Sequence, residues 1–536
     1  TRERGDSRFS QASQRALIRI ISDRERKTKI AKMIEENNNN TETPKTEGYK
    51  SLKFSEQEIE DLVKAGKDWQ HCNGCLMRNL ENEFAVNHTA FVLFPTAFPR
   101  QLYDEATLVQ KDFQLLYFKA SKDYEFIKSS LQRVIIKDEF TRKLFEIYEE
   151  TRSDLKQKIR VNLNRSDYMI NQCKCASNIE TNDQRGGYQL RQIEMNMISV
   201  GALALSPLVG QTHQYLAEVM GEDSPYQANQ IPIHQTHEVL GESLAKAFYK
   251  YGNHRAIVLF IIEHTDINTT DQRHLEHAFH RSIRKSGIKH RVPCLFRNLQ
   301  EIYEKSTLTD DSKLLFEGKE VALCYLRSGY SPNHYSTQER WDARLRIEKS
   351  NAIKVPIMSD QLVGTKKVQQ VLAEPGMVER FIHDKNAVQR IRKTFAGLYS
   401  LDEGAEGDQI IEDALKTPSN FVLKPQREGG GNNLYDQEMV DELRRISNDP
   451  EERSQYILME RIRPPVVHSY IVRPESLKPM ESEIVSELGI LGVIMSDGDD
   501  IIQNESCGHL LKSKDWQRGE GGLIAGRAGI DSPCLI

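Results

Sequence analysis

The stretch from Phe421 to Asn433 combines the residue types that a nucleotide-binding loop needs. Its apolar beginning, Phe421–Leu423, predicts a short buried strand that ends at Lys424. Three consecutive glycines, Gly429–Gly431, follow, and a backbone without Cβ atoms can fold closely over a polyphosphate and point its N–H groups toward it. Lys424 adds positive charge, and Glu428 offers an oxygen ligand of the kind that Mg²⁺ prefers.

This arrangement is not the GxxxxGK[ST] phosphate loop, because the lysine precedes the glycines and no serine or threonine opens a following helix. A glycine-rich hairpin tip is the alternative for three glycines alone. The charged and amide side chains around them, ending in Asn432 and Asn433, favour a nucleotide loop instead.

Glu194 and Asn196 form a second candidate group. They stand two residues apart, so on a strand their side chains project from the same face. Oxygen ligands at that spacing suit Mg²⁺, whereas the simpler alternative is the solvated face of an ordinary strand.

Two cysteine pairs, Cys72 with Cys75 and Cys173 with Cys175, are the remaining candidates for chemistry. They suit a four-thiolate zinc site or disulfides, but neither pair has a second CxxC at the spacing of a zinc ribbon. Free thiols are the expected state in a reducing compartment.

Helices predicted from apolar periodicity come first along the chain. Residues Phe54–Trp69 suit an amphipathic helix in which Ser55 is the N-cap and Glu58 completes a capping box. Leu108–Phe118 and Asp138–Arg160 show the same helical pattern.

The pattern changes in the middle of the chain. Ala256–Ile262 and Val321–Leu326 are apolar runs typical of buried strands, and Asp271–Ser286 between them predicts a helix. This alternation indicates a parallel α/β subdomain. Near the C-terminus, Ile484–Ser496 and Gly508–Ser513 predict antiparallel strands that carry side chains to a site.

The composition indicates a globular protein and excludes some partners. The chain has 536 residues, of which 38% are hydrophobic and 28% charged, enough for a sizeable core in two or three domains. A net charge of −5 argues against general binding of nucleic acid or anionic membranes. No apolar run approaches the length of about 18 residues that a membrane helix needs.

The first residues differ from the rest. Residues 1–32 hold ten lysines or arginines against four acidic residues, and a low-complexity asparagine run follows. Without an apolar signal-peptide core, we expect residues 1–48 to be a disordered extension. A signal peptide removed upstream of Thr1 would leave open that the protein is secreted.

Together, several stretches resemble motifs of eukaryotic glutathione synthetases, which are ATP-grasp ligases, and they occur in the family's order. They are Leu163–Tyr168, Gln192–Asn196, Arg327–Tyr330, Gly364–Gln370, Lys424–Asn433, Met459–Ile462 and Ser486–Gly489. The resemblance implies a mixed α/β protein with an ATP-grasp fold, a glycine-rich lid and an inserted α/β subdomain that binds substrate. It also implies the segments 49–254, 255–367 and 368–536, with the first and third building the main body.

The resemblance implies roles for the nucleotide and metal residues. ATP would be held by residues of the lysine, glycine and strand motifs: Lys366, Lys424, Gly429, Gly430, Gly431, Asn433, Tyr435, Met459, Glu460, Ile462, Glu487, Lys514 and Glu520. Mg²⁺, as two ions, would be bound by Glu194, Asn196 and Glu428.

On the substrate side, Arg165 resembles the arginine that clamps a carboxylate of γ-glutamylcysteine, a task that suits a planar guanidinium. Arg165 and Lys512 are the residues expected to act in catalysis. The remainder of the implied pocket is Ile198, Ser199, Val200, Gly201, Asn268, Gln272, Arg327, Ser328, Gly329, Tyr330, Leu523 and Ile524.

Three departures from the family pattern fall on this substrate side. Gly201 stands where the family has a serine, Lys512 replaces an arginine, and Ile524 replaces an alanine in the loop that closes over glycine. Lysine keeps the charge of arginine but loses its fork.

The expected function is therefore ATP- and Mg²⁺-dependent joining of γ-glutamylcysteine to glycine through an acyl phosphate. The alternatives are a related ligase with another small amine as acceptor and weak glutathione synthesis, and a secreted nucleotide-binding protein without ligase activity. By resemblance, we expect a cytoplasmic homodimer that binds neither nucleic acid nor membranes.

Overall fold

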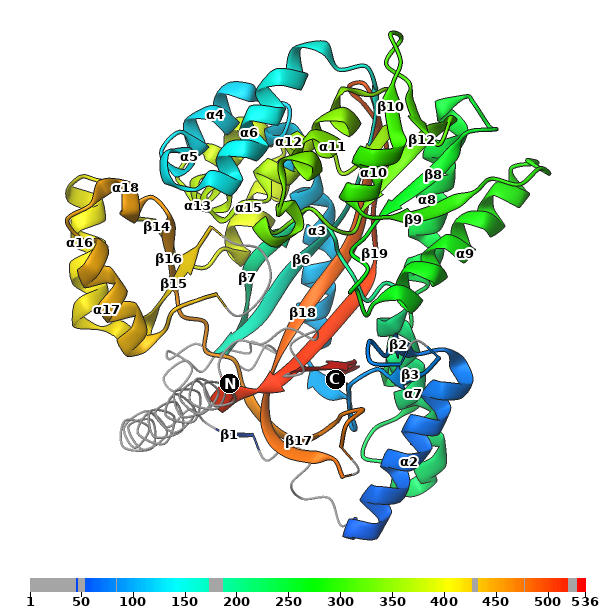
Figure 1. Ribbon diagram of the computed structural model, residues 1–536. Helices are drawn as coiled ribbons and strands as arrows, with labels where there is room; N and C mark the ends of the chain where they lie inside the picture. The colour runs from blue at the N-terminus through cyan, green and yellow to red at the C-terminus, as the bar shows by residue number, and fades with distance from the viewer. Residues whose placement is uncertain are drawn as a thin grey trace, which may run out of the picture. The chain divides into compact units, whose positions relative to one another are not determined.

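The site is built on a large, mostly antiparallel sheet. The computed structural model describes residues 45–46, 54–82, 84–172, 187–426, 432–476, 478–518 and 528–536. The order of its strands is β1 (Lys45–Thr46), β17 (Val466–Val472), β4 (Phe91–Val92), β20 (Ala528–Asp531), β19 (Asp500–Asp515), β18 (Met480–Asp497), β6 (Ile159–Gln172) and β7 (Tyr188–Asn196). The long strands β6, β18 and β19 lie side by side (Figure 1).

Both faces of this sheet are covered by apolar side chains, as expected for strands that are hydrophobic almost throughout. In β18, Leu488 and Ile490 join one core cluster, whereas Leu491 and Val493 join the other. Successive residues of a strand point to opposite faces, so these two pairs lie on the two sides of the sheet.

A chain of buried amides fastens helix α3 (Arg100–Ala120) to the sheet. Gln110 donates to the side-chain oxygen of Asn164 at 2.7 Å, and Gln114 donates to the carbonyl oxygen of Val493 at 2.9 Å. A Cβ atom at Gly492 would lie 1.8 Å from Oε1 of Gln114, so glycine is required for this contact. These hydrogen bonds hold α3 against the strand that carries Arg165, although Oε1 of Gln110 has no partner among the described residues.

The second sheet contains the predicted strand–helix–strand unit. Its order is β10 (Ser306–Leu308), β11 (Leu314–Phe316), β12 (Lys319–Leu326), β8 (Ile257–Ile261) and β9 (Cys294–Arg297), and β13 (Ile353–Val355) also pairs with β12. The pairs β8–β12, β8–β9 and β12–β13 are parallel. The helix between β8 and β9 is α9 (Thr269–Lys285), which lies beside α8 (Thr236–Tyr251) (Figure 1). The prediction of parallel α/β structure here is confirmed.

A smaller three-stranded sheet carries the start of the glycine-rich stretch. Its order is β14 (Leu398–Ser400), β16 (Tyr456–Glu460) and β15 (Phe421–Pro425). Helices α16 (Ala405–Lys416) and α17 (Asp436–Ile446) pack with it around Leu401, Leu423 and Leu458. Two short pairs complete the strands: β2 (Leu76–Arg78) with β3 (Val86–His88), and β5 (Thr96–Phe98) with β21 (Pro533–Leu535).

The other helices are α2 (Glu56–Asn73), α4 (Tyr124–Leu131), α5 (Val134–Lys137), α6 (Glu139–Thr151), α7 (Leu205–Met220), α10 (Leu299–Lys305), α11 (Gln338–Lys349), α12 (Met358–Val363), α13 (Lys366–Ala373), α14 (Met377–Phe381), α15 (Lys385–Thr394) and α18 (Pro450–Arg453). In α2 the predicted capping box is present, since Ser55 and Glu58 each accept a backbone N–H of the other. None of the helices among the described residues is both long and apolar enough to span a bilayer.

One predicted element is wrong at its end. The helix expected over Asp138–Arg160 stops at Thr151, and strand β6 begins at Ile159. From Ile159 to Tyr168, β6 pairs residue by residue with β18. The hydrogen bonds to β18 and the burial of both faces of β6 outweigh the helical periodicity, because that periodicity reflects only residues close together in the sequence.

From Thr46 to Ile536 the chain forms one compact unit. The predicted segment boundaries near residues 254 and 367 lie inside this unit, and they remain predictions. Residues 1–44, which include most of the expected extension, lie outside the described part of the chain.

Candidate functional site

A cavity of about 770 Å³ opens where the three sheets approach one another. Its wall includes residues from β6, β7, β15, β18, β19 and β20, from the start of α13 and from the segment that follows β12. The predicted site residues that line it are Arg165, Glu194, Asn196, Ile198, Ser199, Val200, Gly201, Asn268, Arg327, Ser328, Tyr330, Lys366, Lys424, Asn433, Glu487, Lys512 and Lys514. Residues far apart in sequence thus face one space.

One side of the cavity pairs carboxylate and amide oxygens with lysines. Strand β7 carries Glu194 and Asn196, and the expectation that they share a strand face agrees with their common position on the cavity wall. Nζ of Lys366 lies 3.4 Å from Oε2 of Glu194, and Nζ of Lys424 lies 3.4 Å from the carbonyl oxygen of Ile193. Burial alone would raise the pKa of Glu194, but Lys366 and Lys424 hold this pKa below its usual value.

The opposite side is a chain of alternating charges. Nε and Nη2 of Arg165 donate to the two carboxylate oxygens of Asp167 at 2.6 and 2.7 Å, a bidentate pair. Nζ of Lys512 lies 3.4 Å from Oδ2 of Asp167 and also pairs with Glu487. Asn196 donates to the same Asp167 oxygen at 3.0 Å, which links the two sides of the cavity.

The pKa values of the two acids move in opposite directions. Burial would raise the pKa of Asp167, but Arg165 and Lys512 outweigh it and leave the pKa well below its usual value. Burial raises the pKa of Glu487, and the nearby charge of Asp167 adds to this despite Lys512. The fork of Arg165 fits only because Gly489 has no side chain, since a Cβ there would lie 2.6 Å from Cδ of Arg165.

Arg327 closes another part of the wall. It follows strand β12, and its Nη1 donates to the carbonyl oxygens of Ser199 and Val200, in the latter case at 2.5 Å. A Cβ atom at Gly201 would lie 3.1 Å from Nη2 of Arg327, tighter than most real contacts. Gly201 therefore lets the guanidinium pack against the backbone of the 199–201 loop.

Several predicted residues lie beside the cavity instead of on its wall. Gln272 donates to Asp266 at 2.6 Å, and Asp266 itself lines the cavity. Gly329, with φ +91°, accepts a hydrogen bond from Gln361. Tyr435, Met459 and Ile462 join a small apolar cluster with Val422 on the three-stranded sheet.

Of the remaining predicted site residues, Glu460 is among the described residues and the others are not. Glu460 ends strand β16 and is exposed. Glu428, Gly429, Gly430, Gly431, Glu520, Leu523 and Ile524 lie outside the described residues.

Sequence reasoning gave no role to four titratable residues at the site: Glu263, Asp266 and His334 line the wall, and Asp167 pairs with Arg165. Asp167 belongs to a quoted motif but received no role, although a residue two positions from Arg165 on a strand must share its face. Glu263 and Asp266 follow β8, and His334 follows β12. Positions just beyond the carboxyl ends of parallel strands commonly line ligand sites, so this signal was readable.

The cysteine pairs hold no described cross-link. Cys72 and Cys75 are free thiols, one exposed and one buried, as expected for a reducing compartment. Burial raises the pKa of Cys75 to about 12, so its thiol stays protonated. Cys173 and Cys175 lie outside the described residues.

Comparison with known proteins adds independent information. The model of the family "Eukaryotic glutathione synthase, ATP binding domain" matches residues 56–535. Glutathione synthetase of Bos taurus is 39% identical over 91% of this chain and 99% of its own length. The chloroplastic glutathione synthetase of Arabidopsis thaliana is 35% identical over 90% of this chain and 87% of its own.

Solved structures include a similar one. The apo structure of a glutathione-synthetase-like effector from Globodera pallida superposes with a TM-score of 0.71 at 25% identity. The match covers 90% of this chain and 98% of that one.

Proposed function

Since this chain belongs to the eukaryotic glutathione synthase family, we propose that it is an ATP-dependent carbon–nitrogen ligase that joins γ-glutamylcysteine to glycine. Its fold is the mixed α/β, ATP-grasp type of that family. The observation that carries the proposal is the single cavity in which the lysines Lys366, Lys424 and Lys514 face Glu194, Asn196 and Arg165.

The reaction requires that the phosphates are bound, that donor and acceptor are held together and that water is excluded. Transfer of the γ-phosphoryl group of ATP to the donor carboxylate makes an acyl phosphate, and attack by the amine releases phosphate. Lys366 and Lys424 would bind the phosphates and neutralise charge as the phosphoryl group moves. The walls from β7, from β19 and from the segment after β12 would hold donor and acceptor together and exclude water, which would hydrolyse the intermediate.

We further propose that Mg²⁺ takes part. Carboxylate and amide oxygens are the donors that this ion accepts, and Glu194 and Asn196 present both on one side of the cavity. Glu428 would complete the set. Bound there, the ion would orient the phosphates and offset their charge.

Replacement of Glu428 by alanine is expected to abolish ADP release without unfolding the protein. Near-normal turnover of this variant would contradict the role of Glu428 in binding Mg²⁺.

For the donor, Arg165 would contact a carboxylate of γ-glutamylcysteine, and Lys512, which shares Asp167 with it, would contact a substrate carboxylate at the acceptor end. Because Asp167 holds the fork of Arg165 in the structure, an incoming carboxylate must share or replace that partner. Arg165 thus has a preset orientation, which reduces the entropy lost on binding.

A second candidate function is a ligase of the same type with another small amine as acceptor. It is favoured by Lys512, whose single ammonium is already shared between Asp167 and Glu487, and by Gly201, which leaves the guanidinium of Arg327 bound to backbone carbonyls. The similar Globodera pallida protein is named an effector with a glutathione-synthetase-like structure, so the fold itself is compatible with other roles.

The decisive experiment is a coupled assay of ADP release with γ-glutamylcysteine and a panel of amines, with products identified by mass spectrometry. Glycine-dependent ADP release with glutathione as product supports the first function. Faster release with another amine supports the second. ATP binding without ADP release under any combination would contradict both and favour a nucleotide-binding protein.

By family resemblance we also propose a cytoplasmic homodimer. Sedimentation at the mass of a monomer in analytical ultracentrifugation would contradict the dimer. Detection of the native protein in secreted material would contradict the cytoplasmic location.

A further inference from the structure

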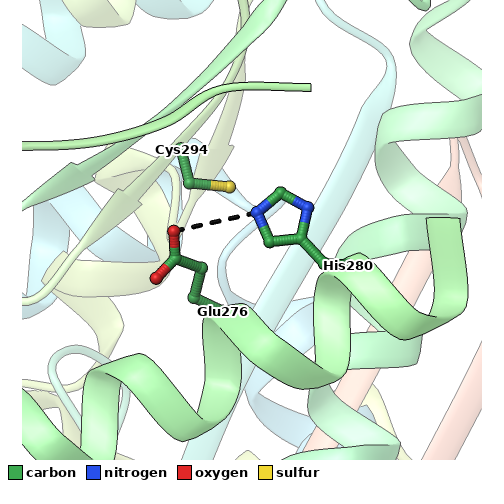
Figure 2. A group of neighbouring side chains, drawn as sticks. All are labelled: Glu276, His280 and Cys294. Atoms are coloured by element: carbon green, nitrogen blue, oxygen red, sulfur yellow. Dashed lines mark ion pairs between the residues drawn. The ribbon is translucent and has the colours of Figure 1, made fainter. Parts of the chain in front are cut away.

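Three side chains with different ligand atoms meet on the inserted α/β part of the chain, apart from the cavity. Glu276 and His280 lie one turn apart on α9, and Cys294 is the first residue of β9 (Figure 2). All their ligand atoms lie within 4.8 Å of one another. Among the described residues this is the group of histidine, cysteine and carboxylate side chains close enough to share a metal ion.

The local structure explains why these residues converge. Positions i and i+4 of a helix point from the same face, so Glu276 and His280 both project toward the sheet. Strand β9 pairs in parallel with β8 through Cys294 and Val258, which fixes where the thiol begins its projection. Figure 2 shows the sulfur, the imidazole and one carboxylate oxygen pointing toward a common space.

The distances suit a small tetrahedral ion. Bonds to Zn²⁺ of about 2.0–2.3 Å imply ligand–ligand separations of roughly 3.3–3.8 Å. The carboxylate oxygen of Glu276 and Nε2 of His280 are 3.7 Å apart. The remaining separations reach at most 4.8 Å, so a change of about 1 Å, within the reach of side-chain rotation, would complete the geometry.

The surroundings also resemble those of a ligand set. The side chain of Glu276 is 12% exposed and that of His280 is 33% exposed, so the group is shielded but reachable from solvent. Nη1 of Arg273 donates to Oε2 of Glu276 at 2.6 Å, while the guanidinium stacks 3.8 Å from the ring centroid of Phe296. Ligating carboxylates commonly have such an outer partner, which orients them and leaves the other oxygen for the metal.

The thiol in its present state is protonated. Burial raises the pKa of Cys294 far above its usual value, with Glu276 adding to the shift. A bound metal ion reverses this, because coordination removes the thiol proton and the ion compensates the buried negative charge.

We propose that Glu276, His280 and Cys294 bind a Zn²⁺ ion, with a fourth position left for water or an external ligand. A carboxylate, an imidazole and a thiolate together select zinc over Mg²⁺ or Ca²⁺, which take oxygen ligands. The site is separate from the ATP cavity, since Glu276 lies eight residues, or about 12 Å, along α9 from Asn268 on the cavity wall.

The ion would connect α9 to β9. Because α9 begins next to Asn268 on the cavity wall and contains Gln272, which donates to the wall residue Asp266, a metal bridge would hold the helix that supports this part of the wall. The expected consequence is a more stable subdomain, and this holds whatever the acceptor amine is.

Cobalt titration of the full chain tests the proposal. Protein freed of metal by chelation is titrated with Co²⁺, which replaces Zn²⁺ in tetrahedral sites and gives a thiolate-to-metal charge-transfer band only when bound to sulfur. We expect one equivalent to produce the band and Zn²⁺ to remove it. Cys294→Ser should abolish the band, and His280→Ala should weaken Co²⁺ binding by about tenfold or more.

Matched controls separate this site from the other ligands of the chain. His277→Ala removes the neighbouring exposed histidine of the same helix and should leave the titration unchanged. A double variant, Cys173→Ser with Cys175→Ser, removes the most closely spaced of the other thiol pairs and should keep the band. Zn²⁺ should raise the Tm of the unmodified protein and of both controls, but not that of Cys294→Ser.

Three results would overturn the proposal: no thiolate band at millimolar Co²⁺, a band that persists in Cys294→Ser, or a band lost in the Cys173/Cys175 double variant. ADP release by Cys294→Ser with ATP and Mg²⁺, measured after removal of the chelator and without added Zn²⁺, checks that this variant is folded. If that variant is unfolded, Cys294→Ala and the His280→Ala titration decide instead.

Discussion

Two lysines that are neighbours in the sequence, Lys366 and Lys367, form ion pairs with different acids. Lys366 reaches Glu194 in the cavity, whereas Nζ of Lys367 lies 2.7 Å from Oδ2 of Asp402, away from the cavity wall. Both side chains are almost fully buried. These two buried lysines of one helix turn thus have different surroundings: the proposed phosphate-binding Lys366 faces the cavity, and Lys367 pairs away from it.

We expect Lys366→Gln to lower kcat/KM for ATP by at least about 100-fold, because a cation that neutralises transferring phosphate contributes several kcal/mol. The matched variant Lys367→Gln should lower the Tm through loss of the Asp402 pair but keep the KM for ATP. Equal effects of both variants on the KM for ATP would contradict the assignment of Lys366.

The acceptor side gives a second prediction at this scale. Lys512→Arg combined with Ile524→Ala restores the forked cation and the smaller side chain of the family pattern, and each departure is expected to cost about 1–3 kcal/mol. The double variant should raise kcat/KM for glycine and leave ATP affinity unchanged. If the unmodified protein already prefers glycine strongly, or the double variant changes nothing, the acceptor site is not redirected.

Among the elements, helices α8 and α9 cross closely, and α9 begins beside Asn268 of the cavity wall. A Cβ atom at Gly241 of α8 would lie 2.5 Å from Cβ of Ala278 and 2.8 Å from the backbone nitrogen of Phe279 on α9. Backbone atoms cannot move aside as the end of a side chain can. The two helices therefore approach to a distance that only glycine permits.

Gly241→Ala should push α9 away and destabilise the protein by about 1–3 kcal/mol, as overpacking of a core typically does. Because Asn268 lies at the start of α9, the KM for γ-glutamylcysteine should rise more than the KM for ATP. The control is Glu242→Ala, which removes an exposed pair with Lys246 that contributes little. A Tm unchanged in Gly241→Ala would show that the helices are not closely packed.

For the molecule as a whole, buried histidines make stability depend on pH. Burial lowers the pKa of His213 to about 4 and that of His509 to about 3, from a usual value of 6.5. His213 donates from Nε2 to the carbonyl oxygen of Val92 at 2.7 Å, which a neutral ring does well. Below pH 6.5 the unfolded chain binds protons at both residues while the folded chain does not, so stability is present above 6.5 and is lost as the pH falls.

Between pH 7 and pH 5, each of these histidines should remove about 2 kcal/mol of unfolding free energy, since each pKa unit corresponds to about 1.4 kcal/mol. Urea unfolding at the two pH values measures the loss. His213→Gln keeps a donor for Val92 but cannot be protonated, so its stability should fall less with pH. Exposed His71→Gln is the control, and a pH dependence of His213→Gln equal to that of the unmodified chain would contradict this account.

Motifs whose chemistry depends on a few neighbouring residues could be predicted from the sequence. The strand positions of Glu194 and Asn196, the strand that ends near Lys424 and the capping box of α2 follow from spacing and local hydrogen bonding. The parallel strands around α9 follow from the alternation of apolar runs. These features need only short segments of chain, so the sequence alone determined them, and with them the class of fold.

Contacts between distant segments were decided by the tertiary structure alone. The spacing of residues did not indicate that Lys512 and Arg165 would both pair with Asp167. It did not indicate that Lys366 and Lys367 would pair with different acids. Nor did it indicate that Cys294 would lie close to Glu276 and His280. The same holds for β6, where a helical pattern yielded to pairing with β18 some 330 residues later. Side-chain partners across such separations depend on how whole sheets and helices pack, and that balance of burial and pairing energies is not encoded in any local period of the sequence.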